Sequence, residues 1–155
     1  MKTAIVCKSI HHGNTLQVAE AMAEELGADI FTPEEIDDET LRQYDMIGFG
    51  SGIYNARHHR SLLNRVKDLH DLSTKEVFVF YTSGFDKFPV FSSFETALSK
   101  ELEEKGVHIA GMFHCRGFQT WGPFRFRGGR NKGHPDEADL ENARAFVRNL
   151  DTAES

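Results

Sequence analysis

Apolar residues in this chain gather in short runs, and the stretches between the runs show the three-to-four-residue spacing of helices. The first run, Thr3–Cys7, is continuous in residues suited to burial and does not alternate with polar positions. A strand covered on both faces of a parallel sheet has this pattern. Runs of the same kind predict five strands, at Thr3–Cys7, Ala28–Phe31, Met46–Gly50, Val77–Tyr81 and Val107–Cys115.

The stretch Asn14–Leu26 is the clearest helical segment. Gly27 follows it, as glycine often follows the last turn of a helix. Its apolar positions are predicted to share one helical face, namely Leu16, Ala19, Met22, Ala23 and Leu26. Further helical segments are expected at Thr40–Gln43, from the end of a loop at Ser51–His59 to about Leu72, at Phe94–Lys105, and from Pro135 and Asp136 to Leu150.

Strands that alternate with helices predict an α/β fold. Parallel neighbours need crossover connections, and right-handed crossovers place helices on both faces of the sheet. We therefore expect three α/β/α layers around a doubly wound, five-stranded parallel sheet of order 2-1-3-4-5. A length of 155 residues suits one domain, so residues 1–155 are interpreted as a single unit.

The composition is that of an ordinary folded protein, with 39% hydrophobic and 27% charged residues. The net charge of −6 argues against nucleic acid as a main partner. No apolar run approaches the roughly 20 residues that span a bilayer, and the N-terminus lacks a signal-peptide pattern, so a cytoplasmic location is expected. Cys7 and Cys115 lie in strand-like runs without CxxC spacing, which favours buried, reduced thiols.

The residues after the first strand carry the most specific chemical signal. They read Lys8-Ser9-Ile10-His11-His12-Gly13-Asn14-Thr15 and lead directly into the first helix. Small and hydroxylated residues at a helix start expose backbone N–H groups beside the positive end of the helix dipole, and this arrangement binds phosphate. The first strand-to-helix loop is therefore expected to hold an anionic ligand.

Two later loops belong to the same expected edge of the sheet, because ligands of open parallel sheets bind outside the carboxyl ends of the strands. The second loop is Gly50–Ala56, in which glycines let the backbone approach a ligand and Tyr54 offers a flat ring. The third is Thr82–Phe85, again small residues followed by an aromatic one. Together the loops suit a planar heterocycle with one phosphate, which indicates a mononucleotide.

Several other kinds of site are disfavoured. Neither the dinucleotide pattern GxGxxG nor the nucleotide pattern GxxxxGK[ST] occurs, and Ser83 does not stand in GxSxG. The eight histidines and two cysteines lack structural-zinc spacing, so no metal site is expected. A phospho-acceptor receiver domain would need acidic residues after the first and third strands, where this chain has Lys8–His11 and Gly50–Gly52.

The three loops, with the ending Lys132–Asp136, resemble the flavodoxin family over essentially the whole chain. The resemblance implies a flavodoxin-like fold and the cofactor flavin mononucleotide (FMN). It places the phosphate in the first loop and the flavin ring between the second and third loops. The implied cofactor-binding residues are Ser9, His11, His12, Gly13, Asn14 and Thr15, then Ser51, Gly52, Ile53, Tyr54 and Asn55, and finally Thr82, Ser83, Gly84 and Phe85.

Two positions depart from the family pattern. A hydroxyl residue commonly precedes the glycine of the first loop, but His12 stands there, and Ser9 lies one residue farther from Gly13 than the usual serine. His11 or His12 is a candidate replacement for the lost hydroxyl; the alternative is a pair of solvated loop residues. The second loop is followed by Arg57-His58-His59-Arg60, where flavodoxins that carry electrons tend to be acidic.

The resemblance implies a protein that moves electrons through its flavin without a catalytic side chain. The first hypothesis is an electron carrier that serves a redox partner protein. The alternative is an FMN-dependent oxidoreductase of quinone-reductase or protoporphyrinogen-oxidase type, because residues 52–61 are similar to flavodoxin-type protoporphyrinogen oxidases, whose substrates carry carboxylates. Trp121 and Phe124 of the loop 117–134 are interpreted either as a flavin cover or partner-binding segment, or as local anchors. The oligomeric state is left open.

Overall fold

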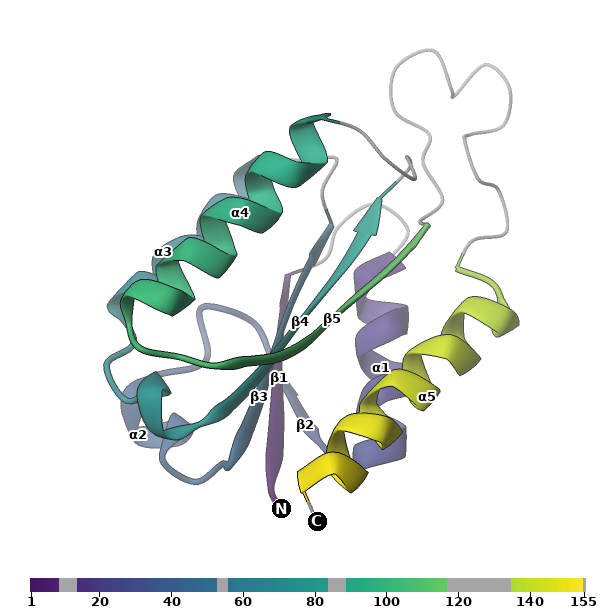
Figure 1. Cartoon of the computed structure of the whole chain (residues 1–155), viewed down its shortest axis with the longest axis horizontal. Coiled ribbons are helices and arrows are strands. Elements are labelled where there is room, and N and C mark those ends of the chain that lie inside the picture. The colour runs from purple at the N-terminus through teal and green to yellow at the C-terminus, as the bar shows by residue number, and fades with distance from the viewer. Residues whose placement is uncertain (9–13, 53–55, 84–88, 117–134, 155) are drawn as a thin grey trace.

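Strands and helices alternate along the chain in the computed structural model, which describes residues 1–8, 14–52, 56–83, 89–116 and 135–154 (Figure 1). The strands are β1 (Thr3–Lys8), β2 (Asp29–Phe31), β3 (Met46–Gly52), β4 (Glu76–Ser83) and β5 (Ile109–Arg116). The helices are α1 (Asn14–Leu26), α2 (Asp38–Leu41), α3 (Ala56–Asp68), α4 (Pro89–Glu104) and α5 (Glu137–Glu154), with a 3₁₀ turn at Leu72–Thr74.

The strands form one sheet of order β2-β1-β3-β4-β5, and every neighbouring pair is parallel. This confirms the predicted fold class and strand order. At the ends of the central strands, Lys8 lies opposite Ser51, and Gly52 lies opposite Thr82. The register therefore brings the carboxyl ends of β1, β3 and β4 to one edge of the sheet, which we call the carboxyl edge.

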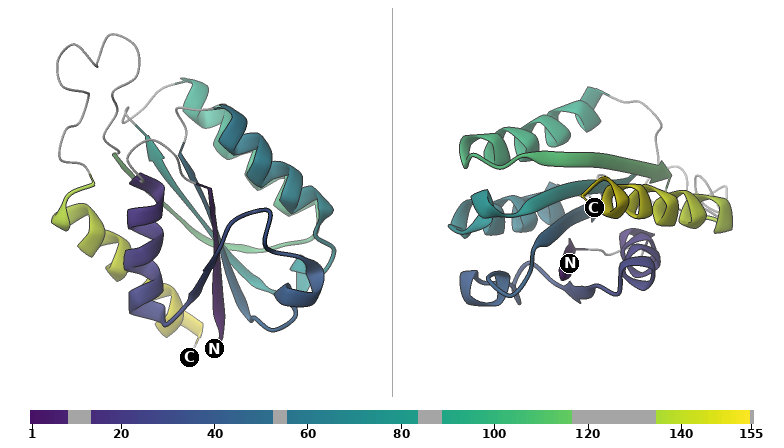
Figure 2. Two further views of the ribbon diagram at one scale, coloured as in Figure 1. Left: turned by 180° about the vertical axis from the view of Figure 1, so that it is seen from behind. Right: turned by 60° about the horizontal axis from the view of Figure 1, so that its bottom comes forward.

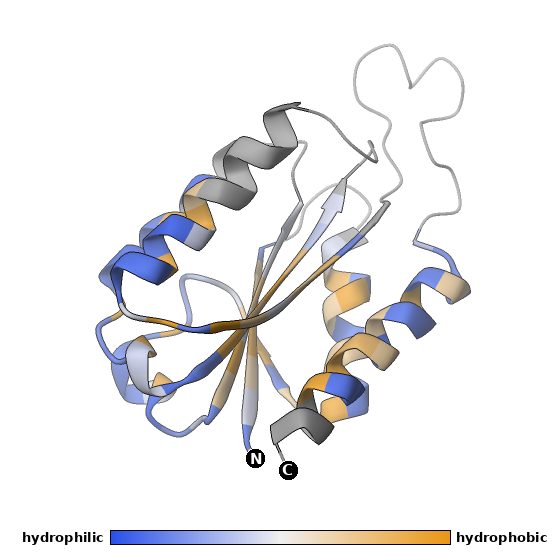
Figure 3. Cartoon of the chain, in the orientation of Figure 1, coloured by the Kyte–Doolittle hydropathy of each residue, from blue (hydrophilic) through white to orange (hydrophobic). Residues whose placement is uncertain are grey.

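Helices cover both faces of the sheet. α1 and α5 lie side by side on one face, and α3 and α4 lie on the other (Figures 1 and 2). Alternate strand residues supply the two cores, because successive side chains of a strand point to opposite faces. Ile5 and Phe78 face α1 and α5, whereas Val6 and Val79 face α3 and α4. Hydrophobic residues accordingly follow the strands and the inner sides of the helices (Figure 3).

β3 carries no side chain at two positions that pack against β4. Gly48 lies opposite Phe78, and Gly50 lies opposite Phe80. A Cβ atom on Gly48 would stand 2.3 Å from Phe78 Cζ, and one on Gly50 would stand 2.0 Å from Phe80 Cζ. Both rings are fully buried. Gly50 therefore makes room for a core ring, which corrects the expectation that it lets the backbone approach a ligand.

α3 differs most from its prediction. It begins at Ala56, where a loop to His59 was expected, and it ends at Asp68, before Leu72. Among Arg60–Asp68, where burial is described, its buried positions are Leu62 and Val66. The first turn consists of polar and cationic residues after alanine, so apolar spacing gave no sign that the helix had already begun.

Other boundaries moved by a few residues. α4 begins at Pro89 instead of Phe94, in keeping with the preference of proline for the first helical turn. β2 begins at Asp29, β5 spans Ile109–Arg116, and α5 continues to Glu154. None of the helices, over the ranges that the structure describes, is long and apolar enough to cross a membrane.

α1 packs on a face that includes a hydroxyl residue. Leu16, predicted to be buried, is 39% exposed, whereas Thr15 and Val18 are fully buried. The inward stripe is Thr15, Val18, Ala19 and Met22. Because Thr15 occupies the inward position of the first turn, the adjacent Leu16 points outward. Gly27 ends the helix as predicted, with a φ of 65°.

Cys7 is a free thiol in the core, as the sequence predicted. Burial raises its pKa to about 12, and the nearby charge of Glu20 contributes to the same shift. The thiolate is the nucleophilic and metal-binding form of cysteine. Cys7 therefore stays protonated at neutral pH and contributes as a small apolar side chain.

Candidate functional site

The carboxyl edge is where the predicted loops come together. α1 follows β1 on one face of the sheet, and α3 follows β3 on the other, so the crossovers diverge between these two adjacent strands (Figure 1). α4 begins at the same edge after β4. Such a switch point leaves a crevice for ligands in doubly wound sheets. The topology therefore brings the ends of β1, β3 and β4 and the starts of α1, α3 and α4 to one edge of the sheet.

The predicted site residues divide into three groups at this edge. For four of them the structure describes both the backbone and the burial of the residue: Thr15, Ser51, Gly52 and Thr82. For Asn14 and Ser83 the structure describes only the backbone, at the start of α1 and the end of β4. The others lie outside the described residues, namely Ser9, His11, His12, Gly13, Ile53, Tyr54, Asn55, Gly84 and Phe85.

Thr15 and Thr82 meet across the interface between α1 and β4. Their Oγ1 atoms are 2.7 Å apart, which is a short hydroxyl–hydroxyl hydrogen bond. Both residues are fully buried. The side chain of Thr82 therefore lies on the α1 side of the sheet and joins the end of β4 to the first turn of α1.

Ser51 lies at the end of β3 with its side chain engaged. Its Oγ donates a hydrogen bond to the backbone carbonyl of Gly52 at 3.2 Å, and both residues are buried. In the sheet Ser51 lies between Lys8 of β1 and Tyr81 of β4. This hydrogen bond holds the backbone at the last residue of β3.

Lys8, the last residue of β1, joins a polar cluster beside the carboxyl edge. Its Nζ lies 3.1 Å from Glu34 Oε1, and Ser61 Oγ of α3 donates to the same oxygen at 3.0 Å. The pKa of Glu34 is lowered to about 2, because its carboxylate accepts hydrogen bonds from its own backbone N–H and then from Lys8 and Ser61. The cluster links three parts of the chain, namely β1, α3 and the segment before α2, and it neutralises the cation at the end of β1.

This cluster predicts an acid-sensitive contribution to stability. Because the folded-state pKa of Glu34 lies below its ordinary value of 4.5, the stabilisation is complete above about pH 5 and is lost as the pH falls toward about 2. The Glu34 side chain is 56% exposed, so solvent screens the effect and a modest change is expected.

The test is urea unfolding of the wild type and Glu34→Gln between pH 5 and about pH 2. The variant should be less stable at pH 5, and the difference should shrink as the pH falls. Glu24→Gln, at an exposed position of α1, controls for the loss of one negative charge. A wild-type-to-variant difference that is constant across this range would show that Glu34 does not titrate in this way.

The first turns of the helices differ in charge. α1, α3 and α4 have no acidic residue in their first turn, whereas α2 has Asp38 and Glu39, and α5 has Glu137 and Asp139. The positive dipole ends of α1, α3 and α4 are thus left without a neighbouring carboxylate of their own. No cluster of three or more metal-ligating side chains occurs in the parts of the chain that the structure describes. The carboxyl edge therefore carries helix ends that attract an anion.

Two features of this edge were missed by reasoning from the sequence. The hydrogen bond between Thr15 and Thr82 joins residues 67 positions apart, and the contact of Lys8 with Glu34 joins residues 26 apart. Both follow from helix and strand register, which residue types do not reveal. One local signal for the Thr82 contact was available: Thr82 continues the row of apolar strand residues Phe78 and Phe80 with a hydroxyl side chain.

Comparisons of sequence agree with this fold. A family model described as a flavodoxin domain matches residues 5–118 of the chain. A protein of Methanocaldococcus jannaschii, described as uncharacterized, is 41% identical over 150 residues, which cover 97% of this chain and 98% of that protein.

Solved structures share the architecture. Oxidised Flavodoxin 2 from Bacillus cereus superposes with a TM-score of 0.71 at 21% identity, covering 99% of each chain. A flavodoxin of Streptococcus pneumoniae TIGR4 gives a TM-score of 0.71 at 16% identity over 99% of each chain. Rubredoxin oxygen:oxidoreductase from Desulfovibrio gigas gives 0.63 at 13% identity, covering 98% of this chain and 35% of that one. At these identities the structures establish a shared fold.

Proposed function

The chain belongs to the flavodoxin family of flavin-binding redox proteins, and on that premise we propose that it binds FMN and carries electrons to or from a redox partner protein. The observation that carries the proposal is the composition of the carboxyl edge. Hydroxyl and backbone donors at the start of α1 lie beside the ends of β1, β3 and β4, with no carboxylate in the first turn of α1.

The donors present fit a phosphate monoester. The first turn of α1 offers backbone N–H groups at the positive end of a 13-residue helix, and Thr15 adds a hydroxyl. Lys8 forms an ion pair with Glu34, so the phosphate would be bound by these neutral donors. Asn14 and Thr15, with the backbone of residues 12–13, would hold the phosphate.

The rest of the cofactor would lie between the other two loops. Residues 51–55, which leave β3, and residues 82–85, which leave β4, would flank the flavin ring, since these strands are adjacent. A bound flavin supplies reversible storage of one or two electrons. The protein's own part is to hold the ring at the edge of the sheet and to set its electrostatic surroundings, while the protonated thiol of Cys7 stays out of the redox chemistry.

One observation favours a second function, an FMN-dependent oxidoreductase acting on a quinone or a carboxylated substrate. Because α3 begins at Ala56, the residues Arg57–Arg60 occupy its first turns at the carboxyl edge. Arg60 is exposed. A cationic helix start next to a flavin site would attract an anionic substrate or an acidic partner.

Titration of the purified protein with FMN tests the proposal. Binding should shift the visible flavin bands and quench flavin fluorescence, with saturation at one FMN per chain. Absence of binding at micromolar protein and FMN would refute both functions. The two are then separated with the flavin-loaded protein: rapid multiple turnover with a quinone and NAD(P)H supports the oxidoreductase, whereas slow turnover with reversible reduction by a chemical donor supports the carrier.

A further inference from the structure

Two apolar rows end in hydroxyl groups where α1 meets β4. Along β4, the residues on the α1 side are Phe78, Phe80 and Thr82, and the first two are core rings. Along α1, the inward stripe starts at Thr15 and then passes to Val18. The layer nearest the carboxyl edge therefore consists of a threonine pair, although valine has the same shape and would continue the core.

A fully buried hydroxyl is costly unless it forms a hydrogen bond. Thr15 Oγ1 and Thr82 Oγ1 satisfy each other at 2.7 Å, and either oxygen is able to donate. A hydroxyl has one proton and two acceptor positions. One proton of the pair is used in this bond, so the other remains available for a third group. The position of Thr15 in the first turn of α1 puts that group at the helix start.

We propose that Thr82 is a positioning residue for the phosphate of the flavin. It donates its proton to Thr15 Oγ1, which fixes the side chain of Thr15 and leaves the proton of Thr15 for a phosphate oxygen at the start of α1. This inference rests on the proposed function, because it needs a phosphate in the first loop. It gives Thr82 a role different from lining the flavin ring.

The test compares two probes, FMN and riboflavin, which differ only in the phosphate. Thr82→Val keeps the shape and removes the donor. It should weaken FMN binding about tenfold, because Thr15 is no longer held for its hydrogen bond to the charged phosphate, and change riboflavin binding by less than about twofold. Thr82→Ser, which keeps the hydroxyl, should restore most of the affinity for FMN. Thermal melting of each ligand-free variant reports stability separately.

A second comparison asks whether Thr82 acts through Thr15. Thr15→Val should weaken FMN binding at least as much as Thr82→Val, and the double variant should be no weaker than Thr15→Val alone. The double variant also replaces both hydroxyls by methyl groups, so it keeps the packing if Thr82→Val folds poorly. Thr82→Ala also removes the hydroxyl and serves as a second single variant at this position.

The FMN and riboflavin titrations have the following outcomes that count against the inference. A loss in Thr82→Val that is equal for FMN and riboflavin would mean a purely structural role and overturn the inference, as would additive effects of the two threonines or no loss at all. A wild type that binds FMN and riboflavin equally well would overturn the inference while leaving flavin binding intact. A wild type that binds neither would overturn the proposed function as well.

Discussion

Gly50→Ala should lower the free energy of unfolding by about 2–3 kcal/mol, the upper range for overpacking a core. The added Cβ would lie 2.0 Å, 2.2 Å and 2.6 Å from three ring atoms of Phe80. The ring has no free space to enter, since Phe80 is fully buried and stacks on Phe78 with 6.2 Å between ring centroids. Either the ring or the β3–β4 pairing must therefore shift.

A shorter side chain at position 80 should relieve the clash. In Gly50→Ala/Phe80→Leu the new methyl group partly fills the space that the ring vacates, so the double variant should be more stable than Gly50→Ala alone. The coupling from the four-variant cycle should favour the double variant by about 1 kcal/mol or more. Urea unfolding gives all four values.

Gly111→Ala is a matched control on the same face of the sheet. The atoms nearest to its Cβ would be the ends of Phe146 and Leu150, at 3.0 Å or more, and both residues are partly exposed. The loss should therefore be clearly smaller than for Gly50→Ala. Equal stabilities of Gly50→Ala and the wild type would contradict the packing described for β3 and β4.

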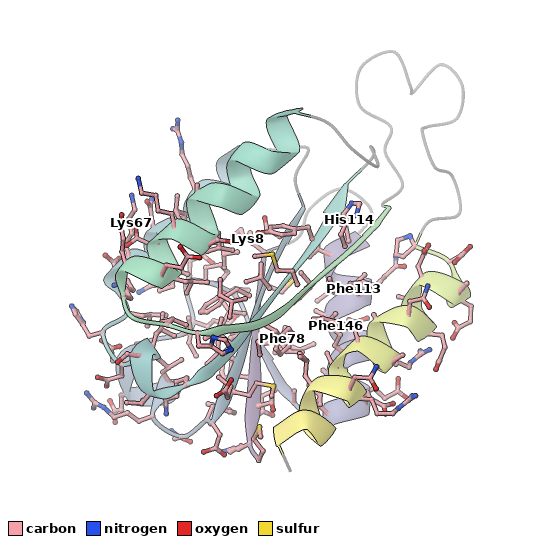
Figure 4. The ribbon with its side chains drawn as sticks, viewed as in Figure 1. Lys8, Lys67, Phe78, Phe113, His114 and Phe146 are labelled. Atoms are coloured by element: carbon pink, nitrogen blue, oxygen red, sulfur yellow. The ribbon has the colours of Figure 1, made fainter. Side chains whose placement is uncertain are left out.

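Phe78→Ala should cost about 3–5 kcal/mol, the range for removing a fully buried aromatic ring. Phe78 joins the sheet to α5: its ring lies 6.1 Å from that of Phe146 and 6.2 Å from that of Phe80. Phe113 completes the group from β5, with 5.6 Å between its ring and that of Phe146 (Figure 4). Truncation would leave a cavity beneath α5 that these rings cannot fill by small movements.

Urea unfolding of three variants tests this expectation. Phe78→Leu should lose only about 1 kcal/mol, since most of the buried volume is kept, and it provides a readable value if Phe78→Ala does not fold. Phe31→Ala should lose less than Phe78→Ala, because Phe31 is partly exposed at the end of β2 and its ring contacts Tyr44. If Phe31→Ala proved the more damaging change, Phe78 would not be the centre of this core.

Local features of the sequence were sufficient for the general architecture. The continuous apolar run of β1 requires burial on both faces, and burial on both faces together with helical connections requires a parallel sheet. The same reasoning identified Cys7 as a buried thiol and Gly27 as a helix end, because each depends on a residue's immediate chemistry. The carboxyl ends of β1, β3 and β4 were also expected at one edge, since the strands are parallel, and the sheet register confirms this.

Other features depended on contacts between residues far apart in the sequence, which no local pattern reveals. The start of α3 at Ala56 was hidden, because its first turn makes no apolar stripe. Gly50 looked like a ligand-binding glycine until the β3–β4 register placed it against Phe80. Thr15 was expected only as a residue of the phosphate loop, and the packing of α1 on the sheet showed that its hydroxyl is bonded to Thr82.

The sequence by itself determined the order of strands and helices and the family resemblance, because hydrophobic periodicity and turn residues act over a few positions. The tertiary structure decided which neighbours each of those residues meets. Strand register and helix rotation, both set by close packing of the whole core, made Gly50 a partner of Phe80 and joined Thr15 to Thr82 at the carboxyl edge.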